Sequence, residues 1–148
     1  MLYSILAQMP WKSPSVDYHA IAPEIILAGG ICLIILVDLF TSETKKWITA
    51  SLTGFVMLGA LVPVLTLAVS DINVRSLFDG RYVVDEFALT LKALFLIAGY
   101  VVVLLSQNHV EEGDYYQGEY YTLLLTSVAG MAMMASSRDL VSIFVSLE

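Results

Sequence analysis

The run R-D-L-V-S-I-F-V-S-L-E, from Arg138 to Glu148, places an apolar stretch between a polar pair and a carboxylate. In an α-helix, which rises about 1.5 Å per residue, the carboxylate lies about 13 Å beyond the polar pair, close to half of the ~30 Å hydrocarbon thickness of a bilayer. An ionised carboxylate costs about 3 kcal/mol or more at that depth, so such a residue usually has a function. Glu148 is therefore the first candidate for a catalytic residue, and we expect its helix to continue beyond it, since a spanning helix needs about 20 residues.

The composition of the whole chain is typical of an integral membrane protein. Of its 148 residues, 58% are hydrophobic and 14% are charged, and the mean hydropathy is +0.80, whereas a soluble domain carries about 25% charged residues. The apolar residues form blocks of about the length of a membrane-spanning helix, and each block is apolar on every side. We predict an all-α integral membrane protein with four transmembrane helices and the first half of a fifth, at about 21–40, 47–69, 87–107, 120–136 and 139–148.

Residues 1–20 precede the first apolar block and combine a short apolar lead with Pro10, Trp11, Lys12 and Pro14. A secretory signal starts with basic residues and ends in a cleavable site of small residues. Neither pattern is evident, so we predict a retained N-terminal segment that lies at the membrane interface, followed by the transmembrane region at 21–148.

Charge and sulfur content exclude several kinds of partner. The formal charge of −7 argues against nucleic acid, which needs a basic face. The single cysteine, Cys32, lies inside the first block, so we expect no intramolecular disulfide and no metal site. Met131, Met133 and Met134 are interpreted as packing residues, because a thioether metal site needs several sulfurs converging on one point. We predict that this chain holds no metal and no cofactor.

Two of the charged residues near or inside the apolar blocks, Glu24 and Lys92, need a separate explanation. Glu24 follows Pro23, and we expect both in the first turn of a helix, where Glu24 would stabilise the positive end of the helix dipole. Lys92 lies about six residues, or about 9 Å, into the third block. We expect its ammonium to reach back to the interface, with a proton-relay role as the alternative. Lys92 is thus a second, weaker candidate for a catalytic residue.

The polar segments predict how the helices are connected. In the segment 70–86, β-favouring residues follow Asp79-Gly80, which predicts a small hairpin or an extended segment on the membrane surface. A very short turn before Asp139 predicts that the fourth and fifth helices lie side by side, with Asp139 as the N-cap. Thr126 and Gly130 form a face of small residues on which another helix can approach closely.

The run from Ser137 to Glu148 resembles the start of the fifth transmembrane helix in the antiporter-like subunits of respiratory NADH:quinone oxidoreductase, or complex I. Three other regions look most like subunit N: Pro23-Glu24-Ile25-Ile26-Leu27, Phe87 to Leu96, and Thr126 to Ala135. Subunits L and M and the subunits of multi-subunit sodium/proton antiporters share the same acid. The resemblance covers nearly the whole chain in layout, and the final run is its most specific part.

The resemblance implies that Glu148 matches a buried glutamate that carries protons and is paired with a lysine on a later helix. It further implies the N-terminal fragment of a subunit that takes part in proton translocation, driven by quinone reduction elsewhere in the complex. The expected location is the bacterial inner (plasma) membrane, and the expected partners are the lipid bilayer and other membrane subunits. NADH, flavin, iron–sulfur clusters and quinone are implied for the whole complex.

The chemistry of a buried carboxyl group agrees with this role. Burial favours its protonated form and a nearby ammonium favours its ionised form, so movement of a lysine loads and unloads a proton. Two alternatives remain open. One is a fragment of a multi-subunit cation/proton antiporter subunit, which would show sodium-dependent transport without NADH oxidation. The other is a membrane scaffold or assembly protein, in which replacement of Glu148 would leave transport unchanged.

Overall fold

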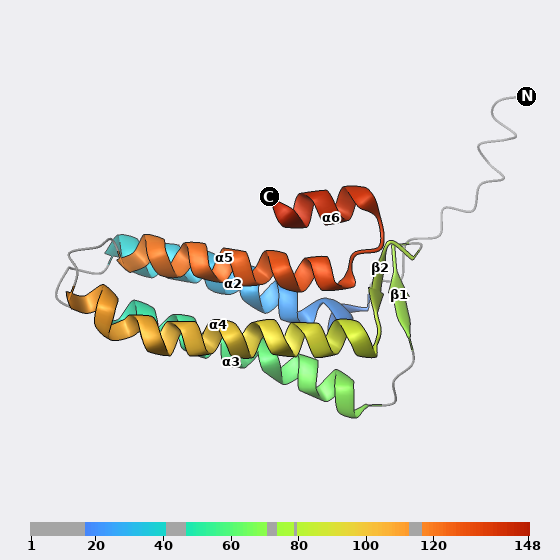
Figure 1. Cartoon of the computed structure of the whole chain (residues 1–148), viewed down its shortest axis with the longest axis horizontal. Coiled ribbons are helices and arrows are strands. Elements are labelled where there is room, and N and C mark those ends of the chain that lie inside the picture. The colour runs from blue at the N-terminus through green and yellow to red at the C-terminus, as the bar shows by residue number, and fades with distance from the viewer. Residues whose placement is uncertain (1–16, 41–46, 71–73, 79, 113–116) are drawn as a thin grey trace, which may run out of the picture.

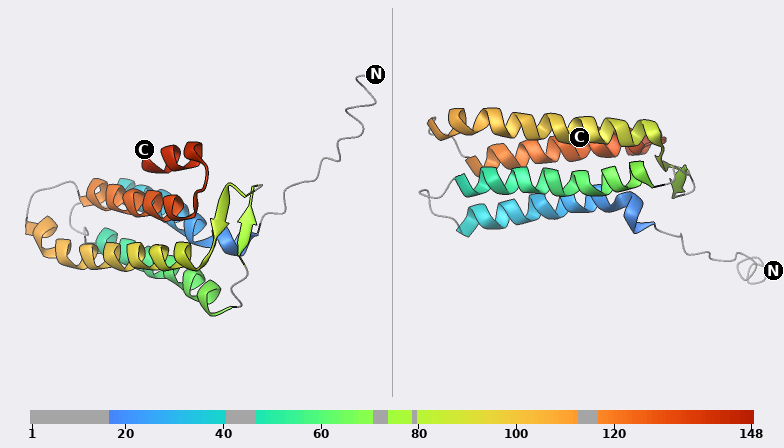
Figure 2. Two further views of the ribbon diagram at one scale, coloured as in Figure 1. Left: turned by 45° about the vertical axis from the view of Figure 1, so that its right-hand side comes forward. Right: turned by 90° about the horizontal axis from the view of Figure 1, so that it is seen from below.

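The computed structural model describes residues 17–40, 47–70, 74–78, 80–112 and 117–148. Its elements, in chain order, are α2 (Tyr18–Phe40), α3 (Trp47–Val69), β1 (Arg75–Leu77), β2 (Tyr82–Val84), α4 (Glu86–Glu112), α5 (Gln117–Ser136) and α6 (Leu140–Leu147). The four long helices α2 to α5 lie side by side as a bundle (Figure 1 and Figure 2). The two strands form a hairpin at one end of this bundle, and α6 lies over α5 (Figure 1).

The core of the bundle follows from the spacing of apolar residues along each helix. Helix α2 packs against α3 and α5, and α4 packs against the same two helices. A spacing of seven residues returns to the same helix face after about two turns. The buried residues of α2 and α4 keep this spacing: Ala20, Leu27 and Ile34, and Leu89, Leu96, Val103 and Val110. Each helix therefore presents one continuous apolar stripe to the centre of the bundle.

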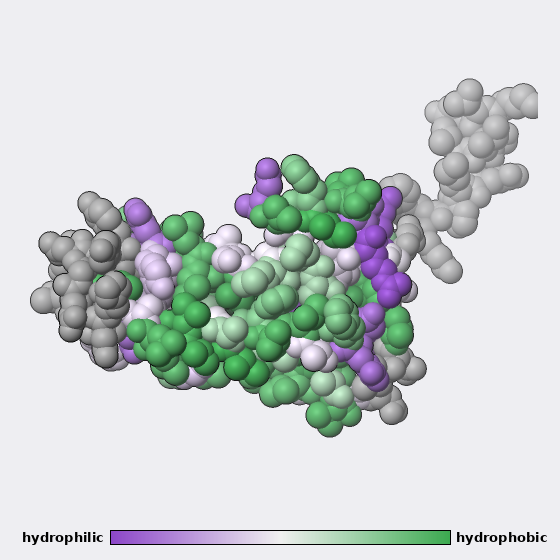
Figure 3. All heavy atoms as spheres, in the orientation of Figure 1, coloured by the Kyte–Doolittle hydropathy of each residue, from purple (hydrophilic) through white to green (hydrophobic). Residues whose placement is uncertain are grey.

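The outer surface of the bundle is also apolar (Figure 3). Leu36, Phe55 and Leu105, for example, are 57%, 72% and 75% exposed. Within the described residues, three helices are long and apolar enough to cross a membrane: Tyr18–Phe40, Trp47–Val69 and Glu86–Gln107. These features support the predicted class of helical, multi-pass membrane protein. Helix α5 begins with more polar residues and is not one of the three.

The start of α2 differs from the prediction. The helix begins at Tyr18, inside the predicted interfacial segment 1–20, of which residues 1–16 lie outside the described residues. The Asp17 carboxylate accepts a hydrogen bond from the His19 backbone N–H at 3.1 Å, which is the function of an N-cap. Pro23 consequently lies inside the helix. The prediction that Glu24 stabilises the first turn is wrong, because Asp17 supplies an earlier cap.

The predicted hairpin is confirmed, since β1 and β2 pair antiparallel. It is joined to the turn between α5 and α6. The backbone N–H of Arg138 donates to the carbonyl of Arg81 at 2.9 Å, and Tyr82 forms an antiparallel bridge with Ser137. These contacts place the side chain of Tyr82 at the end of the bundle core.

Close approach of α6 to α5 depends on a glycine. A β-carbon at Gly130 would lie 2.7 Å from the Ser146 carbonyl oxygen, so the missing side chain leaves room for the α6 backbone. This agrees with the predicted face of small residues at Thr126 and Gly130. Asp139 occupies the N-cap position of α6 as predicted, although its side chain makes no capping hydrogen bond.

An ion pair joins the start of α2 to β1. Arg75 Nη1 donates to Asp17 Oδ2 at 2.6 Å, and the two side chains are 34% and 38% exposed. This hydrogen bond is the largest influence on Asp17 and lowers the pKa of its carboxyl group below the ordinary value. A lowered folded-state pKa means that the pair stabilises the fold above the unfolded-state pKa, about 3.9 for aspartate. The stabilisation is lost as the pH falls through the folded-state value.

Asp17→Asn is expected to lower the free energy of unfolding at neutral pH by less than about 1 kcal/mol, because the pair is partly exposed and solvent screens it. Asparagine is also a good N-cap, so the cap itself is retained. Urea unfolding of the purified protein in detergent, at neutral pH and again at a pH below the folded-state pKa of Asp17, measures the effect. The difference from the unchanged protein should vanish at the lower pH, and a constant difference would contradict the assignment.

Candidate functional site

A carboxylate and an ammonium are buried together near the hairpin end of the bundle. Lys92 Nζ, on α4, lies 2.7 Å from Glu24 Oε1, on α2, and donates a hydrogen bond to the Tyr82 hydroxyl of β2 at 2.8 Å. The side chains of Lys92 and Glu24 are only 1% and 9% exposed. Ser136, at the end of α5, is also buried and lies beside Tyr82. We call Glu24, Lys92, Tyr82 and Ser136 the buried polar cluster.

The pairing explains how two charges are accommodated in an apolar core. Removing an ion from water costs several kcal/mol, which only a close partner and further hydrogen bonds offset. The Tyr82 hydroxyl, which accepts from Lys92 Nζ at 2.8 Å, is the further hydrogen-bond partner of the ammonium. The prediction that Lys92 reaches back to the interface is therefore wrong. Its buried partner lies on a different helix, which inspection of one apolar block cannot show.

Tyr82 belongs to the hairpin, outside the candidate membrane spans. Burial is the largest influence on its hydroxyl and the negative charge of Glu24 is the next, and both raise the pKa of Tyr82 well above the ordinary value. Ser136 has a smaller, opposing effect. The phenol therefore stays protonated, so its oxygen accepts from Lys92 while its proton remains available to a neighbouring oxygen.

Both charged residues lie in register with the buried stripe of their helix. Glu24 lies three residues before the buried Leu27, and Lys92 lies four residues before the buried Leu96. Residues at these spacings share one helix face. Because each block is apolar on every side, the sequence does not show which face is buried, and it contains no sign that the two residues face each other.

Glu148, the first candidate residue, lies at the end of α6 and is exposed, as is most of that helix. It lines a cavity of about 620 Å³ between α2, α5 and α6, which we call the interhelical cavity. Glu24 lines the same cavity from α2. The Glu24 and Glu148 side chains therefore line the same cavity. Lys92 forms its ion pair with Glu24.

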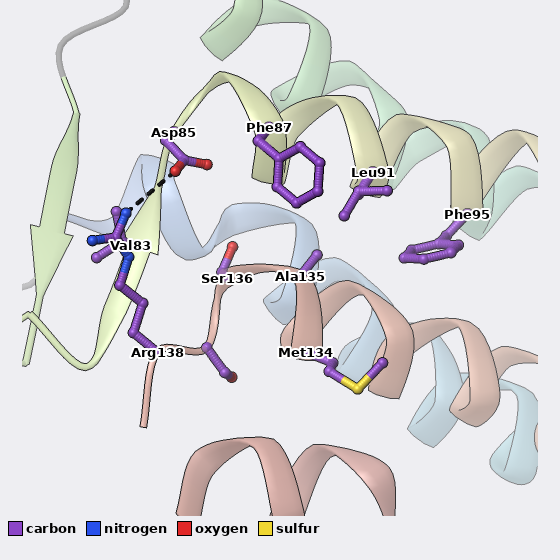
Figure 4. A pocket seen from close by; sticks show the side chains of 10 residues that line it. Val83, Asp85, Phe87, Leu91, Phe95, Met134, Ala135, Ser136 and Arg138 are labelled. Atoms are coloured by element: carbon purple, nitrogen blue, oxygen red, sulfur yellow. Dashed lines mark hydrogen bonds and ion pairs between the residues drawn. The ribbon is translucent and has the colours of Figure 1, made fainter. Parts of the chain in front are cut away.

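A second space, the hairpin pocket, lies where the hairpin, the start of α4 and the end of α5 meet (Figure 4). It has a volume of about 370 Å³, and apolar side chains line one side of it, those of Phe87, Leu91, Phe95 and Met134. Its polar side holds Asp85 and Arg138, whose Oδ2 and Nη2 atoms are 3.4 Å apart. Ser136 also lines this pocket while being only 2% exposed. The hairpin pocket therefore meets the buried polar cluster at Ser136.

No protein-family model matches the chain. Among curated proteins it is similar to NADH-quinone oxidoreductase subunit N of Thioalkalivibrio sulfidiphilus, with 33% identity over 132 residues, and of Anoxybacillus flavithermus, with 38% identity over 136 residues. These matches cover 89% and 90% of this chain and 27% of each relative. Subunit N 2 of Chloroherpeton thalassium is 38% identical over 134 residues, which are 87% of this chain and 25% of that protein. The chain thus spans about a quarter of the length of these relatives, and its predicted resemblance to subunit N of NADH:quinone oxidoreductase is confirmed.

Proposed function

We propose that the chain is part of a membrane-arm subunit of a proton-translocating NADH:quinone oxidoreductase and contributes a buried glutamate to proton transfer. The observation that carries the proposal is the position of Glu148 at the end of an apolar helix, in a cavity of a bundle whose outer surface is apolar. Ionisable groups inside a membrane domain are costly and usually mark a path for protons or ions. The names of the similar proteins supply the enzyme to which this path would belong.

In this proposal Glu148 is the proton-transferring glutamate. Its support is the position at the end of an apolar helix and the cavity that it shares with Glu24. The relatives are about four times as long as the matched region. We propose that helices corresponding to their unmatched part cover α6 and bury Glu148, which gives its carboxyl group the low-dielectric surroundings that favour a bound proton.

The proposal places the protein in the bacterial inner membrane, in contact with lipid and with other membrane subunits of the complex. Helix α5 would be the fourth spanning helix and α6 the beginning of a fifth. Close packing of α5 against α2 and α4 supports this arrangement, since all three lie in one bundle. NADH, flavin, iron–sulfur clusters and quinone are assigned to other parts of the complex, so this chain would act on protons alone.

Glu148→Gln, in the full-length subunit of the assembled complex, is expected to slow proton transfer at this site by about a hundredfold or more, because an amide cannot take up and release a proton at neutral pH. The measurement is NADH-driven proton uptake into membrane vesicles, divided by the rate of NADH oxidation. Glu119→Gln is the matched control, because Glu119 is exposed in the first turn of α5. Unchanged proton uptake in a fully assembled Glu148→Gln complex would contradict the role of Glu148.

The same vesicles separate this function from that of a sodium/proton antiporter subunit. Proton uptake that requires NADH and is independent of sodium supports the oxidoreductase. Sodium-dependent proton movement without NADH oxidation would instead support the antiporter. The relatives reported above are all named subunit N, which favours the oxidoreductase.

A further inference from the structure

Two members of the buried polar cluster each line a space. Glu24 lines the interhelical cavity together with Glu148. Ser136 lines the hairpin pocket, whose polar side holds the Asp85–Arg138 ion pair, and Met134 lines both spaces. Between Glu24 and Ser136, Tyr82 accepts a hydrogen bond from Lys92 at 2.8 Å, and Lys92 lies 2.7 Å from Glu24. The cluster therefore reaches the interhelical cavity through Glu24 and the hairpin pocket through Ser136.

We propose that Glu24 and Lys92 form a second proton-transfer site, which passes protons between the hairpin pocket and Glu148 by way of Tyr82 and Ser136. This inference rests on the proposed function, because Glu148 is its exchange partner. It assigns Glu24, Lys92 and Tyr82 as groups that touch the transferred proton. Ser136 connects them to the hairpin pocket.

The first step moves a proton within the pair. An N–H bond of the Lys92 ammonium breaks and an O–H bond forms on Glu24, so a pair of opposite charges becomes a neutral pair. The net charge of the cluster does not change, and nothing is oxidised or reduced. The two atoms of the ion pair are 2.7 Å apart, so the proton moves over a short distance once an N–H bond of the ammonium is turned toward the carboxylate.

The second step exchanges the proton with Glu148. The O–H bond of Glu24 breaks, water in the interhelical cavity carries the proton, and an O–H bond forms on the Glu148 carboxylate. Lys92 is then neutral beside an ionised Glu24. As the Tyr82 hydroxyl gives its proton to Lys92, it receives another through Ser136 from water in the hairpin pocket in the same step. The phenol therefore stays protonated, and the first state is restored.

Among the described residues, few other titratable groups lie at this site. Glu24 comes from α2, Lys92 from α4 and Tyr82 from β2, and Glu148 lines the interhelical cavity together with Glu24. Asp85 and Arg138 lie at the hairpin pocket. Helix α3 contains no titratable residue, and α5 contributes the Ser136 hydroxyl. In this proposal the charge on Glu148 therefore has the most direct influence on whether the proton is bound to Glu24 or to Glu148.

The test replaces both members of the pair in the full-length subunit of the assembled complex. Glu24→Gln combined with Lys92→Met removes the two charges together and leaves neither of them unpaired. We expect this double variant to assemble and oxidise NADH, and to lose proton uptake per NADH oxidised. Glu119→Gln serves again as the control, with unchanged uptake. Normal proton uptake by the assembled double variant would overturn the inference and leave the pair a structural one.

Tyr82→Phe is the second variant, because it keeps the ring and removes only the hydroxyl. It is expected to reduce proton uptake most at high pH, where reprotonation of Lys92 is limiting, whereas a purely structural hydroxyl would not change the pH profile. An unchanged profile overturns the inference, and this variant decides the question if the double variant fails to assemble. Loss of uptake in Glu148→Gln with normal uptake in both other variants would reject only this inference, while normal uptake in all three would reject the proposed function as well.

Discussion

Lys92→Met is expected to lower the free energy of unfolding by about 3–5 kcal/mol, the usual cost of removing one partner of a buried ion pair. Methionine replaces the length of the lysine stem, so the change leaves little empty space. The substitution removes the ammonium that lies 2.7 Å from the Glu24 carboxylate. The Glu24 side chain is only 9% exposed. The carboxylate would then be buried without its counter-charge. Denaturant unfolding of the purified protein in detergent measures the loss.

The double variant Glu24→Gln with Lys92→Met isolates the cause of this loss. Because neutral residues of similar size commonly replace a buried ion pair at little cost, its stability should return to within about 1 kcal/mol of the unchanged protein. Arg81→Met removes an exposed charge from the hairpin and should change stability by less than about 0.5 kcal/mol. A double variant as unstable as Lys92→Met would show that packing, and not the unpaired carboxylate, explains the effect.

Gly30→Ala is expected to destabilise the bundle by about 1–3 kcal/mol, because it overfills the contact between α2 and α3. A β-carbon at Gly30 would overlap Val56 Cγ1 and lie 2.8 Å from Val56 Cγ2. The valine side chain is branched at its β-carbon and has little rotational freedom in a helix, so it cannot simply turn away. The two helices would have to separate locally, which thermal unfolding of the protein in detergent would detect.

The neighbouring residue provides the matched control. A β-carbon at Gly29 would have no atom within 4 Å, so Gly29→Ala gains helix propensity without a clash and is expected to stabilise by up to about 1 kcal/mol. Combining Gly30→Ala with Val56→Ala should recover part of the lost stability, because it removes the overlapping methyl groups. Equal effects of Gly29→Ala and Gly30→Ala would contradict the packing of α2 against α3.

Similarity to subunit N and the helical membrane class were both predictable from the sequence. The class follows from block lengths and from apolar residues on every side of each block, which are local properties of the chain. The hairpin was predictable for the same reason, since Asp79-Gly80 and the β-favouring residues after it lie within a few positions of one another. The sequence predicted the ends of the helices less accurately. Helix α2 starts at Tyr18, before the apolar block begins, because Asp17 caps it.

The sequence by itself determined the helical membrane class and the approximate extent of the long helices, but because each block is apolar on every side it did not show which face of a helix is buried. Only the tertiary structure decided that Glu24 and Lys92 meet, that Tyr82 completes their contacts, and that Glu24 and Glu148 line one cavity. The physical reason is that a helix propagates through bonds between residues four apart, whereas an ion pair depends on a distance of a few ångströms between distant segments. That distance is set by how whole helices pack.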